Sequence, residues 1–502
     1  MNQTRLAAFD AVMYGVEQDP VLRSTIVVLL VLDGEPDLES GVARVERMTR
    51  LVPKLRQVVA GTPNSVLPPR WETDPNFDLN YHLRRYVVPV EDGTLRPVLR
   101  IAEQMAEQDF DRSRPLWEMA LITGLVDGRA AVVFKIHHSI TDGVGGMAMA
   151  ASLFDLTRET KLPEGPDPDV PEAQSRGTAG RLADGVQYSA VHQVNSLRHY
   201  SEGAFDLLAR VVRDPSGSLT EGAMFASSAA RVLAPANEPM SPVMKGRTLS
   251  LELDVLSVPL ADLKAAGKAV GGTLNDAFLA VVSGGLQRYH ALHGAPVPDI
   301  RVNMPVNMRT DGDSEGNSWV PARFLIPIDI DDPRERMKVL SPLLRHARSE
   351  PALPISDFVM RRLVQLPRGL MTKVAGGLMK GTDVAATNVP GPPIPVYMAG
   401  TEVLAFVPFA PKGGAALNVA LMSYNGMVYL GVNIDTGAVR DPDVLMVCLQ
   451  EALDEVIAVG APVVDRSETK ASKPNKKPAG KPAGKSGKKA KPKAKAKKSK
   501  TS

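Results

Sequence analysis

The sequence predicts an α+β protein built from two mixed-sheet domains. Three observations support this. Apolar strand-like runs alternate with helical patterns in both halves, and a long stretch of helical character separates the halves. A chain of 502 residues is also longer than a domain with a single hydrophobic core usually is. We place the N-terminal domain at 1–165, a helical linker at 166–247, the C-terminal domain at 248–463 and a disordered tail at 464–502.

In the first half, the clearest elements are a strand and a hairpin. Residues 26–32 are uniformly apolar and end at Asp33-Gly34, which predicts a buried strand and a turn. Apolar residues at helical spacing predict a helix over 38–48. Residues 116–125 and 130–136 flank the turn Asp127-Gly128 and predict a hairpin, and a helix is expected over 143–156.

The second half repeats this mixture of elements. Strands are expected at 249–258, 300–306, 323–330 and 427–434, and helices at 261–269, 274–289, 332–349 and 441–459. The segment 176–235 mixes small and apolar residues and is predicted to be largely helical. No repeat of solenoid period appears in either half.

The overall composition is that of a soluble globular protein, with 44% hydrophobic and 23% charged residues. The chain has one cysteine, Cys448, so no disulfide framework forms within it and an intracellular, reducing setting is expected. No secretion signal is read at the start. The longest apolar run, 26–32, is far shorter than the ~20 residues that cross a bilayer, so any membrane contact is expected to be peripheral.

The net charge of +3 hides a strong asymmetry along the chain. Residues 469–502 contain 14 lysines and no acidic residue, which leaves 45 basic and 56 acidic residues in 1–468, a balance of −11. Such a tail has too few apolar residues to order itself. It is either a solubilising extension or an electrostatic attachment to anionic lipid or another polyanion.

The stretch KIHHSITDGVGG, residues 135–146, places two histidines at the end of an apolar run. Adjacent strand residues point to opposite faces, so His137 and His138 cannot both reach one reacting atom. His138 shares a face with Val132, Phe134 and Ile136. With an ordinary histidine pKa of ~6.5, a neutral imidazole there suits a general base.

A purely structural interpretation of this stretch stays open: a core histidine, a surface histidine, and Asp142 as the N-cap of the following helix. Other chemistries find less support. No Cys, Asp or Glu stands at ligand spacing beside the histidines, which disfavours a metal site. The sequence has no Gly-rich phosphate loop followed by lysine.

Several motifs, in order along the chain, resemble one enzyme family. HHSITDG at 137–143 matches the HHxxxDG motif of acyltransferases and condensation enzymes related to chloramphenicol acetyltransferase. PLWE at 115–118, TLND at 273–276 and NVPGPP at 388–393 resemble one branch, the bacterial wax ester synthase/diacylglycerol acyltransferases. The similarity covers about residues 5–460.

This resemblance implies two chloramphenicol acetyltransferase-like domains with an active-site tunnel between them. It implies that His138 is the general base in direct transfer of a long-chain acyl group from acyl-CoA to a hydroxyl. The product is triacylglycerol from diacylglycerol, or wax ester from a long-chain alcohol. Acyl-CoA is a co-substrate, and no other cofactor and no metal is expected.

The resemblance also implies roles for neighbouring residues. Asn275 is the candidate oxyanion donor, although Thr273 and Asp276 form a capping-box pattern that makes this segment equally suited to a simple helix start. His137, Asp142 and Gly143 are expected to shape the site.

Asp142 resembles an aspartate that an arginine holds, and Arg301 and Arg309 are both candidates. Residues expected to line the tunnel or bind substrate are Pro115, Trp117, Asn388, Pro390 and Gly391.

The chain departs from the family after Gly316-Asn317, where Ser-Trp-Val-Pro-Ala-Arg replaces small and apolar residues, so one wall of the channel is expected to differ. Two alternatives stay open: a condensation-type enzyme with another acceptor, and a catalytically silent protein that binds lipid or coats lipid droplets. We expect a cytoplasmic protein at the inner face of the plasma membrane or at lipid droplets, with the Lys-rich tail as a candidate attachment and with no nucleic-acid partner.

Overall fold

The computed structural model describes residues 5–61, 69–89, 93–141, 143–159, 168–170, 238–307, 319–348, 360, 362–364 and 366–461. The chain divides into two compact units, 1–461 and 462–502, and every described residue belongs to the first. The predicted tail and most of the predicted helical linker, apart from 168–170 and 238–247, therefore lie outside the described residues.

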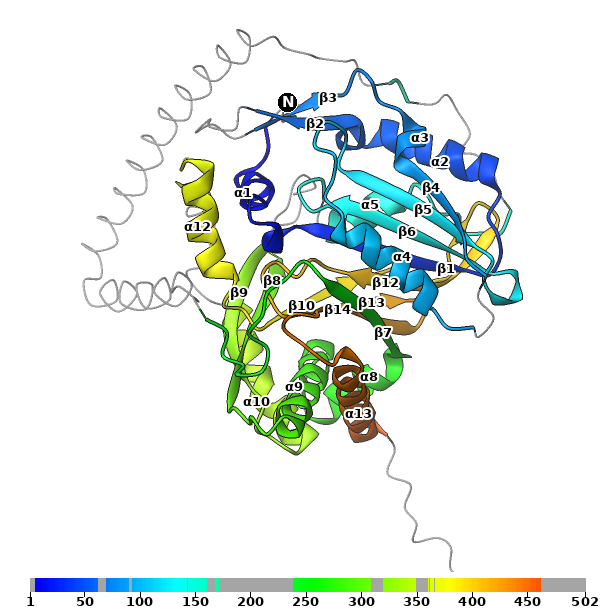
Figure 1. Ribbon diagram of the computed structural model, residues 1–502. Helices are drawn as coiled ribbons and strands as arrows, with labels where there is room; N and C mark the ends of the chain where they lie inside the picture. Colours follow the sequence, from blue (N-terminus) through cyan, green and yellow to red (C-terminus); the bar gives the residue numbers. More distant parts are fainter. Residues whose placement is uncertain are drawn as a thin grey trace, which may run out of the picture. The chain divides into compact units, whose positions relative to one another are not determined.

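Two mixed sheets form the centre of the first unit (Figure 1). The first sheet, as far as the structure describes it, has the strand order β11 (Tyr397–Met398), β12 (Thr401–Phe409), β1 (Thr25–Leu32), β6 (Ala130–His137), β5 (Trp117–Thr123) and β4 (Leu83–Val87). The second sheet has the order β7 (Leu251–Pro259), β14 (Met427–Asp435), β13 (Leu417–Tyr424), β10 (Val384–Pro390), β8 (Asp299–Asn307) and β9 (Trp319–Pro327). A short pair, β2 (Gln57–Ala60) and β3 (Arg70–Thr73), stands apart.

Both sheets combine parallel and antiparallel pairs, as the α+β prediction requires. The pairs β4·β5, β8·β10 and β10·β13 are parallel, and the other described pairs in the two sheets are antiparallel. The predicted hairpin is present, because β5 and β6 pair directly with Trp117 opposite Ile136.

Helices pack around the two sheets. The helices of the first half are α1 (Ala8–Val16), α2 (Leu38–Leu51), α3 (Leu79–His82), α4 (Arg96–Glu107) and α5 (Gly143–Ala150). Those of the second half are α8 (Leu260–Ala269), α9 (Leu274–Leu292), α10 (Pro333–Arg348), α12 (Arg368–Met379) and α13 (Pro442–Gly460). Figure 1 shows α8, α9, α10 and α13 together beside the second sheet, and their buried side chains form one core with it.

Two predicted elements differ from the structure in their limits. Helix α5 ends at Ala150 instead of continuing to 156, because the Ser152 N–H bonds to the Met149 carbonyl in a tighter turn. Strand β9 covers 319–327 instead of 323–330, because its register with β8 runs from Trp319, opposite Asn307, to Pro327, opposite Asp299. Pairing with a neighbour, and not local sequence, sets these strand ends.

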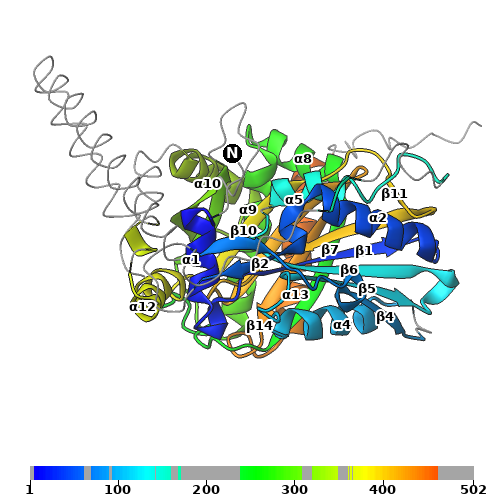
Figure 2. The same cartoon turned by 90° about the horizontal axis from the view of Figure 1, so that it is seen from above.

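The two sheets are linked by a strand that crosses from one half of the chain to the other. β12 belongs to the second half in sequence, yet it pairs along β1 with Leu29 opposite Val407. It also contacts β13 and β14 of the second sheet. Figure 2, seen from above, shows the strands of the two halves overlying one another. The predicted domain boundaries stay predictions, since the chain between 171 and 237 is not described.

β12 and β14 approach each other closely at a glycine. A Cβ on Gly431 of β14 would lie 1.8 Å from the Pro408 carbonyl oxygen of β12. Only a residue without a side chain fits there, so the separation of the sheets depends on this position.

Within the described residues, no single helix is long and apolar enough to cross a membrane, and only α8 with α9, bent by 92° at their junction, passes that test as a pair.

Candidate active site

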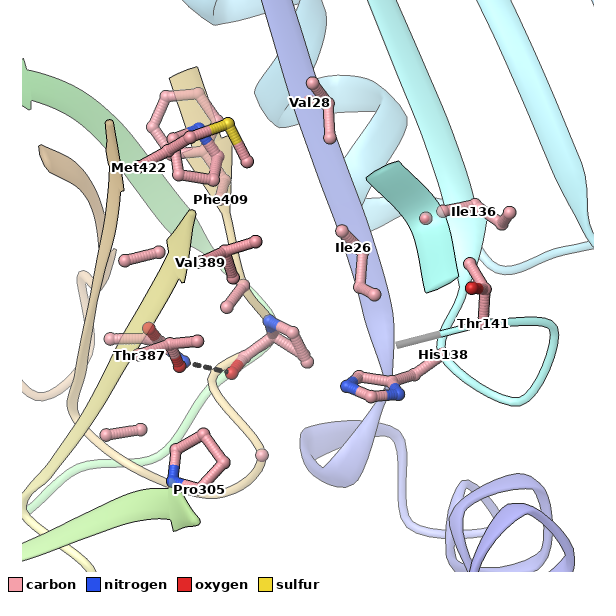
Figure 3. Close-up of a pocket in the computed structure, with 18 of the residues that line it drawn as sticks. Ile26, Val28, Ile136, His138, Thr141, Pro305, Thr387, Val389, Phe409 and Met422 are labelled. Carbon is pink, nitrogen blue, oxygen red and sulfur yellow. Dashed lines mark hydrogen bonds between the residues drawn. The ribbon is translucent and has the colours of Figure 1, made fainter. Parts of the chain in front are cut away.

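The site forms where β6 ends. β6 is almost entirely buried, and its alternate residues Val132, Phe134 and Ile136 line one cavity together with His138. This is the face that the two-residue period of a strand predicted. The His138 N–H donates to the Ser24 carbonyl at 2.8 Å, which fixes the backbone at the end of the strand. Figure 3 shows the imidazole pointing into the space between the sheets, toward Pro305 and Thr387.

That space is a cavity of about 350 Å³ between the two sheets. Its walls are mostly apolar. They come from β1, β5, β6, β11 and β12 of the first sheet, from β8, β9, β10 and β13 of the second, and from helices α1, α2, α5 and α12. The polar side chains that line it are those of His138, Thr141, Asn303, Arg323, Thr382, Thr387, Asn388, Lys412 and Asn418. A long hydrocarbon fits such walls, and only a few groups are available for chemistry.

His137 faces away from this cavity and is fully enclosed. The Ser139 N–H donates to its Nδ1 at 3.0 Å, so in the neutral ring Nε2 carries the proton. Nε2 lies 2.9 Å from Glu17 Oε1. Glu17 also accepts from the Ser24 N–H at 2.6 Å and from Arg112 at 2.8 Å. His137 thus ties the end of β6 to the residue that follows α1.

The Glu17 carboxyl is charged in this network. Burial raises its pKa, but its electrostatic interaction and hydrogen bond with His137, the hydrogen bond from the Ser24 N–H and the charge of Arg112 outweigh burial, and the pKa is lowered. The network stabilises the strand end from which His138 projects.

Asn275 and Asn388 form a hydrogen-bonded pair at the opposite wall. Asn275 lies in the first turn of α9, whose predicted capping box between Thr273 and Asp276 is present. Asn388 Nδ2 donates to Asn275 Oδ1 at 2.6 Å. Of the two, Asn388 lines the cavity and Asn275 does not, so within the described residues Asn275 reaches the cavity through its neighbour.

Other residues singled out from the sequence lie in packed surroundings. Trp117 is fully buried, donates from Nε1 to the Leu55 carbonyl at 2.8 Å and stacks on His82 with ring centres 4.4 Å apart. Pro115, Trp117, Pro390 and Gly391 are not among the described residues that line the cavity. A Cβ on Gly391 would come within 2.4 Å of the Ser423 carbonyl oxygen, which explains a glycine there.

The predicted pairing of Asp142 with an arginine lies outside what the structure describes, because Asp142 and Arg309 are not described. The Arg301 guanidinium donates to the backbone carbonyls of Glu238, at 2.9 Å, and Gly381. Gly143 is the first residue of α5.

Sequence reasoning missed seven of the polar residues that line the cavity: Thr141, Asn303, Arg323, Thr382, Thr387, Lys412 and Asn418. Arg323 is the last residue of Ser-Trp-Val-Pro-Ala-Arg, the stretch that departs from the family. Burial and the charge of Arg301 lower its pKa. Asn418, Ala420 and Met422 alternate along β13, and this two-residue period indicates that they share one strand face. Nothing in the sequence indicated that this face meets a cavity.

The arrangement can therefore position a base beside an apolar chamber. Within the described ranges, no group of three or more His, Cys, Asp or Glu is placed to hold a metal ion. The chemistry that these residues offer is proton transfer at His138 and hydrogen bonding from amides across the cavity.

Two solved structures share this fold. The wax ester synthase/diacylglycerol acyltransferase from Marinobacter aquaeolei VT8 superposes with a TM-score of 0.60 at 22% identity, covering 91% of this chain and all of that one. The starter condensation domain of rhizomide synthetase, solved with C8-CoA and Leu-SNAC, gives a TM-score of 0.52 at 14% identity over 92% of this chain and 95% of that one. At these identities the likeness establishes the fold, and it confirms the predicted fold class.

Sequence comparison gives the family. A protein of Mycobacterium tuberculosis (strain ATCC 25618 / H37Rv), whose name gives it as an inferred diacylglycerol O-acyltransferase, is 36% identical over 455 residues, covering 90% of this chain and 92% of its own length. The model of the wax ester synthase/diacylglycerol acyltransferase catalytic domain matches residues 6–278, and that of the family's C-terminal domain matches 316–456. The chain belongs to the wax ester synthase/diacylglycerol acyltransferase family, as its motifs predicted.

Proposed function

We propose that this protein transfers a long-chain acyl group from acyl-CoA to the hydroxyl of diacylglycerol or of a long-chain alcohol. The observation that carries the proposal is the position of His138, whose imidazole projects into a largely apolar cavity between the two sheets. Family membership adds acyl-CoA and an acyl acceptor as the substrate classes.

In the proposed reaction His138 removes the proton of the acceptor hydroxyl while that oxygen attacks the thioester carbonyl carbon. The C–O bond forms and the carbonyl electrons move to oxygen. When the tetrahedral intermediate collapses, the C–S bond breaks, and the imidazolium returns its proton to the departing CoA thiolate. The atoms balance without an acyl-enzyme, and one imidazole serves as base and then acid.

The developing oxyanion needs a hydrogen-bond donor. Asn275 was the candidate from the sequence, and its contact with Asn388 supports a role for the pair: Asn388 lines the cavity, and one of its two amide hydrogens is held by Asn275. The second amide hydrogen of Asn388 is the proposed donor. Asn275 is then a positioning residue.

The apolar walls favour long acyl chains in the proposed reaction. Each methylene that leaves water contributes about 0.8 kcal/mol, so a chain enclosed by the side chains of β1, β6 and β12 binds through its length. Closing water out of the chamber also favours transfer to the acceptor over hydrolysis of the thioester.

The test uses the full chain with labelled palmitoyl-CoA and either diacylglycerol or hexadecanol. We expect labelled ester, and we expect His138→Ala to lower kcat by roughly 10³-fold, within the range for loss of a general base. The matched control is His293→Ala, a histidine that bonds Asp441 and is not among the described residues that line the cavity. Normal turnover in His138→Ala would exclude the mechanism. Lipid binding without product from the unmodified chain would favour the lipid-coating alternative.

We further propose that the protein works in the cytoplasm, at the inner face of the plasma membrane or at lipid droplets, and that residues 464–502 contribute to this attachment. Support comes from the solubility of the substrates and from the 14 lysines of the tail, each worth about 1 kcal/mol near an anionic surface. A chain truncated at Val464 should float less with phosphatidylserine vesicles at low salt. Equal flotation of both forms would remove the tail from this proposal.

A further inference from the structure

A row of residues crosses the second sheet on the face that meets the first. Strand register places Arg323, Asn303, Ala385, Asn418 and Asn433 side by side on β9, β8, β10, β13 and β14. Paired residues of neighbouring strands point to the same face. The first four line the large cavity, and Asn433 lines a second cavity of about 40 Å³. We call these five residues the polar row.

Three amides of the polar row present oxygens without a donor. Among the described residues, nothing donates to Oδ1 of Asn303, Asn418 or Asn433. Asn418 and Asn433 are 3% and 5% exposed. Their Nδ2 groups donate to the carbonyls of Pro411, at 2.7 Å, and Ala410, at 3.0 Å. A carbonyl only accepts, so these bonds fix both amides and leave each Oδ1 as an oriented acceptor.

The polar row leads from one cavity into the other. Phe409, Pro411 and Lys412 line both cavities, so the two adjoin there. Asn418 lies on the large-cavity side and Asn433 on the small-cavity side. Buried acceptors without donors are costly and rare in native proteins, so a row of them indicates a bound molecule that supplies N–H or O–H groups.

We propose that the polar row binds the amide-containing pantetheine arm of acyl-CoA, which enters through the second cavity. This inference rests on the proposed function and assigns the donor side of that site. The arm carries two amide N–H groups and one hydroxyl, whereas the acyl chain carries no donor and the acceptor alcohol carries the hydroxyl that reacts at His138.

The spacing of the arm fits the strands. One β-alanine unit separates its two amide nitrogens. Because β-alanine has one methylene more than an α-amino acid, the two nitrogens of the extended arm are about 4.8 Å apart. Neighbouring strands are about 4.8 Å apart, so Asn418 and Asn433 stand at the separation of the two N–H groups.

Charge at the second cavity agrees with this direction. Arg23 and Lys412 line it, and so does Glu107. Lys412 bonds Asp435 at 3.0 Å, and Glu107 accepts from the Leu251 N–H at 3.0 Å. The Arg23 guanidinium donates to the Glu107 carbonyl and lies 3.8 Å from Asp109, and its side chain is 20% exposed. The anionic nucleotide end of CoA lies on this side in the proposal.

The first experiment compares three palmitoyl thioesters as donors: palmitoyl-CoA, palmitoyl-pantetheine and S-ethyl palmitothioate, which has no amide. Asn418→Ala and Asn433→Ala should each raise KM about tenfold for the first two donors, the usual effect of one lost hydrogen bond, and leave KM for the third unchanged. Thr387→Val, which changes the same cavity outside the polar row, should affect all three donors alike.

The second experiment tests the direction of entry. Arg23→Gln should raise KM for palmitoyl-CoA but not for palmitoyl-pantetheine, which lacks the nucleotide. Calorimetric titration of free CoA into the full chain should show weaker binding in Asn418→Ala by about tenfold.

Equal effects of the asparagine substitutions on all three donors, or no effect on any, would overturn the proposal. The proposed function fails separately, when the unmodified chain makes no ester from any donor. In that case the CoA titration still tests whether the polar row binds the pantetheine arm, because an unchanged affinity of Asn418→Ala for CoA would exclude that role.

Discussion

Replacing Gly431 with alanine tests how the two sheets are held together. The added Cβ would lie 1.8 Å from the Pro408 carbonyl oxygen, 2.8 Å from its carbonyl carbon and 3.1 Å from a ring carbon of Phe409. Real Cβ contacts essentially never fall below 3.0 Å, so β12 has to move by roughly 1.2 Å. The first two atoms are backbone, and no rotamer change relieves the clash.

The movement is opposed on the far side of β12. Val28 lies opposite Pro408 and Val27 opposite Phe409 in the pairing with β1, so a shift of β12 strains that ladder too. Overpacking a well-packed core costs 1–3 kcal/mol, and we place Gly431→Ala at the upper end, about 3 kcal/mol. Pro408 and Phe409 also line the large cavity, so kcat/KM should fall as well.

Urea unfolding followed by tryptophan fluorescence measures this loss. The matched control is Gly369→Ala in α12, where an added Cβ meets nothing within 4 Å and alanine favours the helix, so stability should hold or rise slightly. If the free energy of unfolding of Gly431→Ala lies within about 0.5 kcal/mol of that of the unmodified chain, β12 and β14 are not in the close contact described above.

Three further substitutions give distinct results. Glu17→Gln should lower stability at pH 7 by about 3 kcal/mol, because His137 loses a buried charged partner. Because folding lowers the pKa of Glu17, its contribution to the free energy of unfolding is present above the unfolded value of 4.5 and is lost as pH falls through the folded pKa. The urea midpoints of Glu17→Gln and of the unmodified chain should therefore converge from pH 7 through pH 5 to pH 4. A difference in midpoint that stays constant with pH would contradict this. Trp117→Phe should lower the free energy of unfolding by about 1–3 kcal/mol in the same assay, because the Leu55 carbonyl loses its hydrogen-bond donor, and kcat should not change. A loss of kcat without a loss of stability would instead place Trp117 at the substrate. Asn388→Ala should lower kcat by about 10²-fold with little change in KM, measured with palmitoyl-CoA, and an effect confined to KM would argue against oxyanion stabilisation.

Local sequence patterns predicted most of the individual elements. The apolar run at β1, the hairpin of β5 and β6, and helices α8, α9 and α13 appear close to their expected limits. The pairing of β12 with β1 was not predicted. Its residues are far from β1 in the chain, and strand patterns carry no information about which distant strand is the partner.

The same division holds for the site. The motif gave His138, and the alternation along β6 gave the face on which it lies. Glu17 could not be predicted as the partner of His137, because α1 and β6 meet only in the folded chain. The polar row was likewise invisible, since it exists only once the register of five strands is known.

The place of β12 in the first sheet has a consequence for synthesis on the ribosome. β1 is made early, but its neighbour on one side, β12, is complete only at Phe409. Until then the nascent chain carries an apolar strand with one open edge, which is a template for aggregation. A fragment that stops before residue 401 should therefore be recovered mainly as insoluble material, and co-expression of a peptide spanning 397–409 should improve its yield.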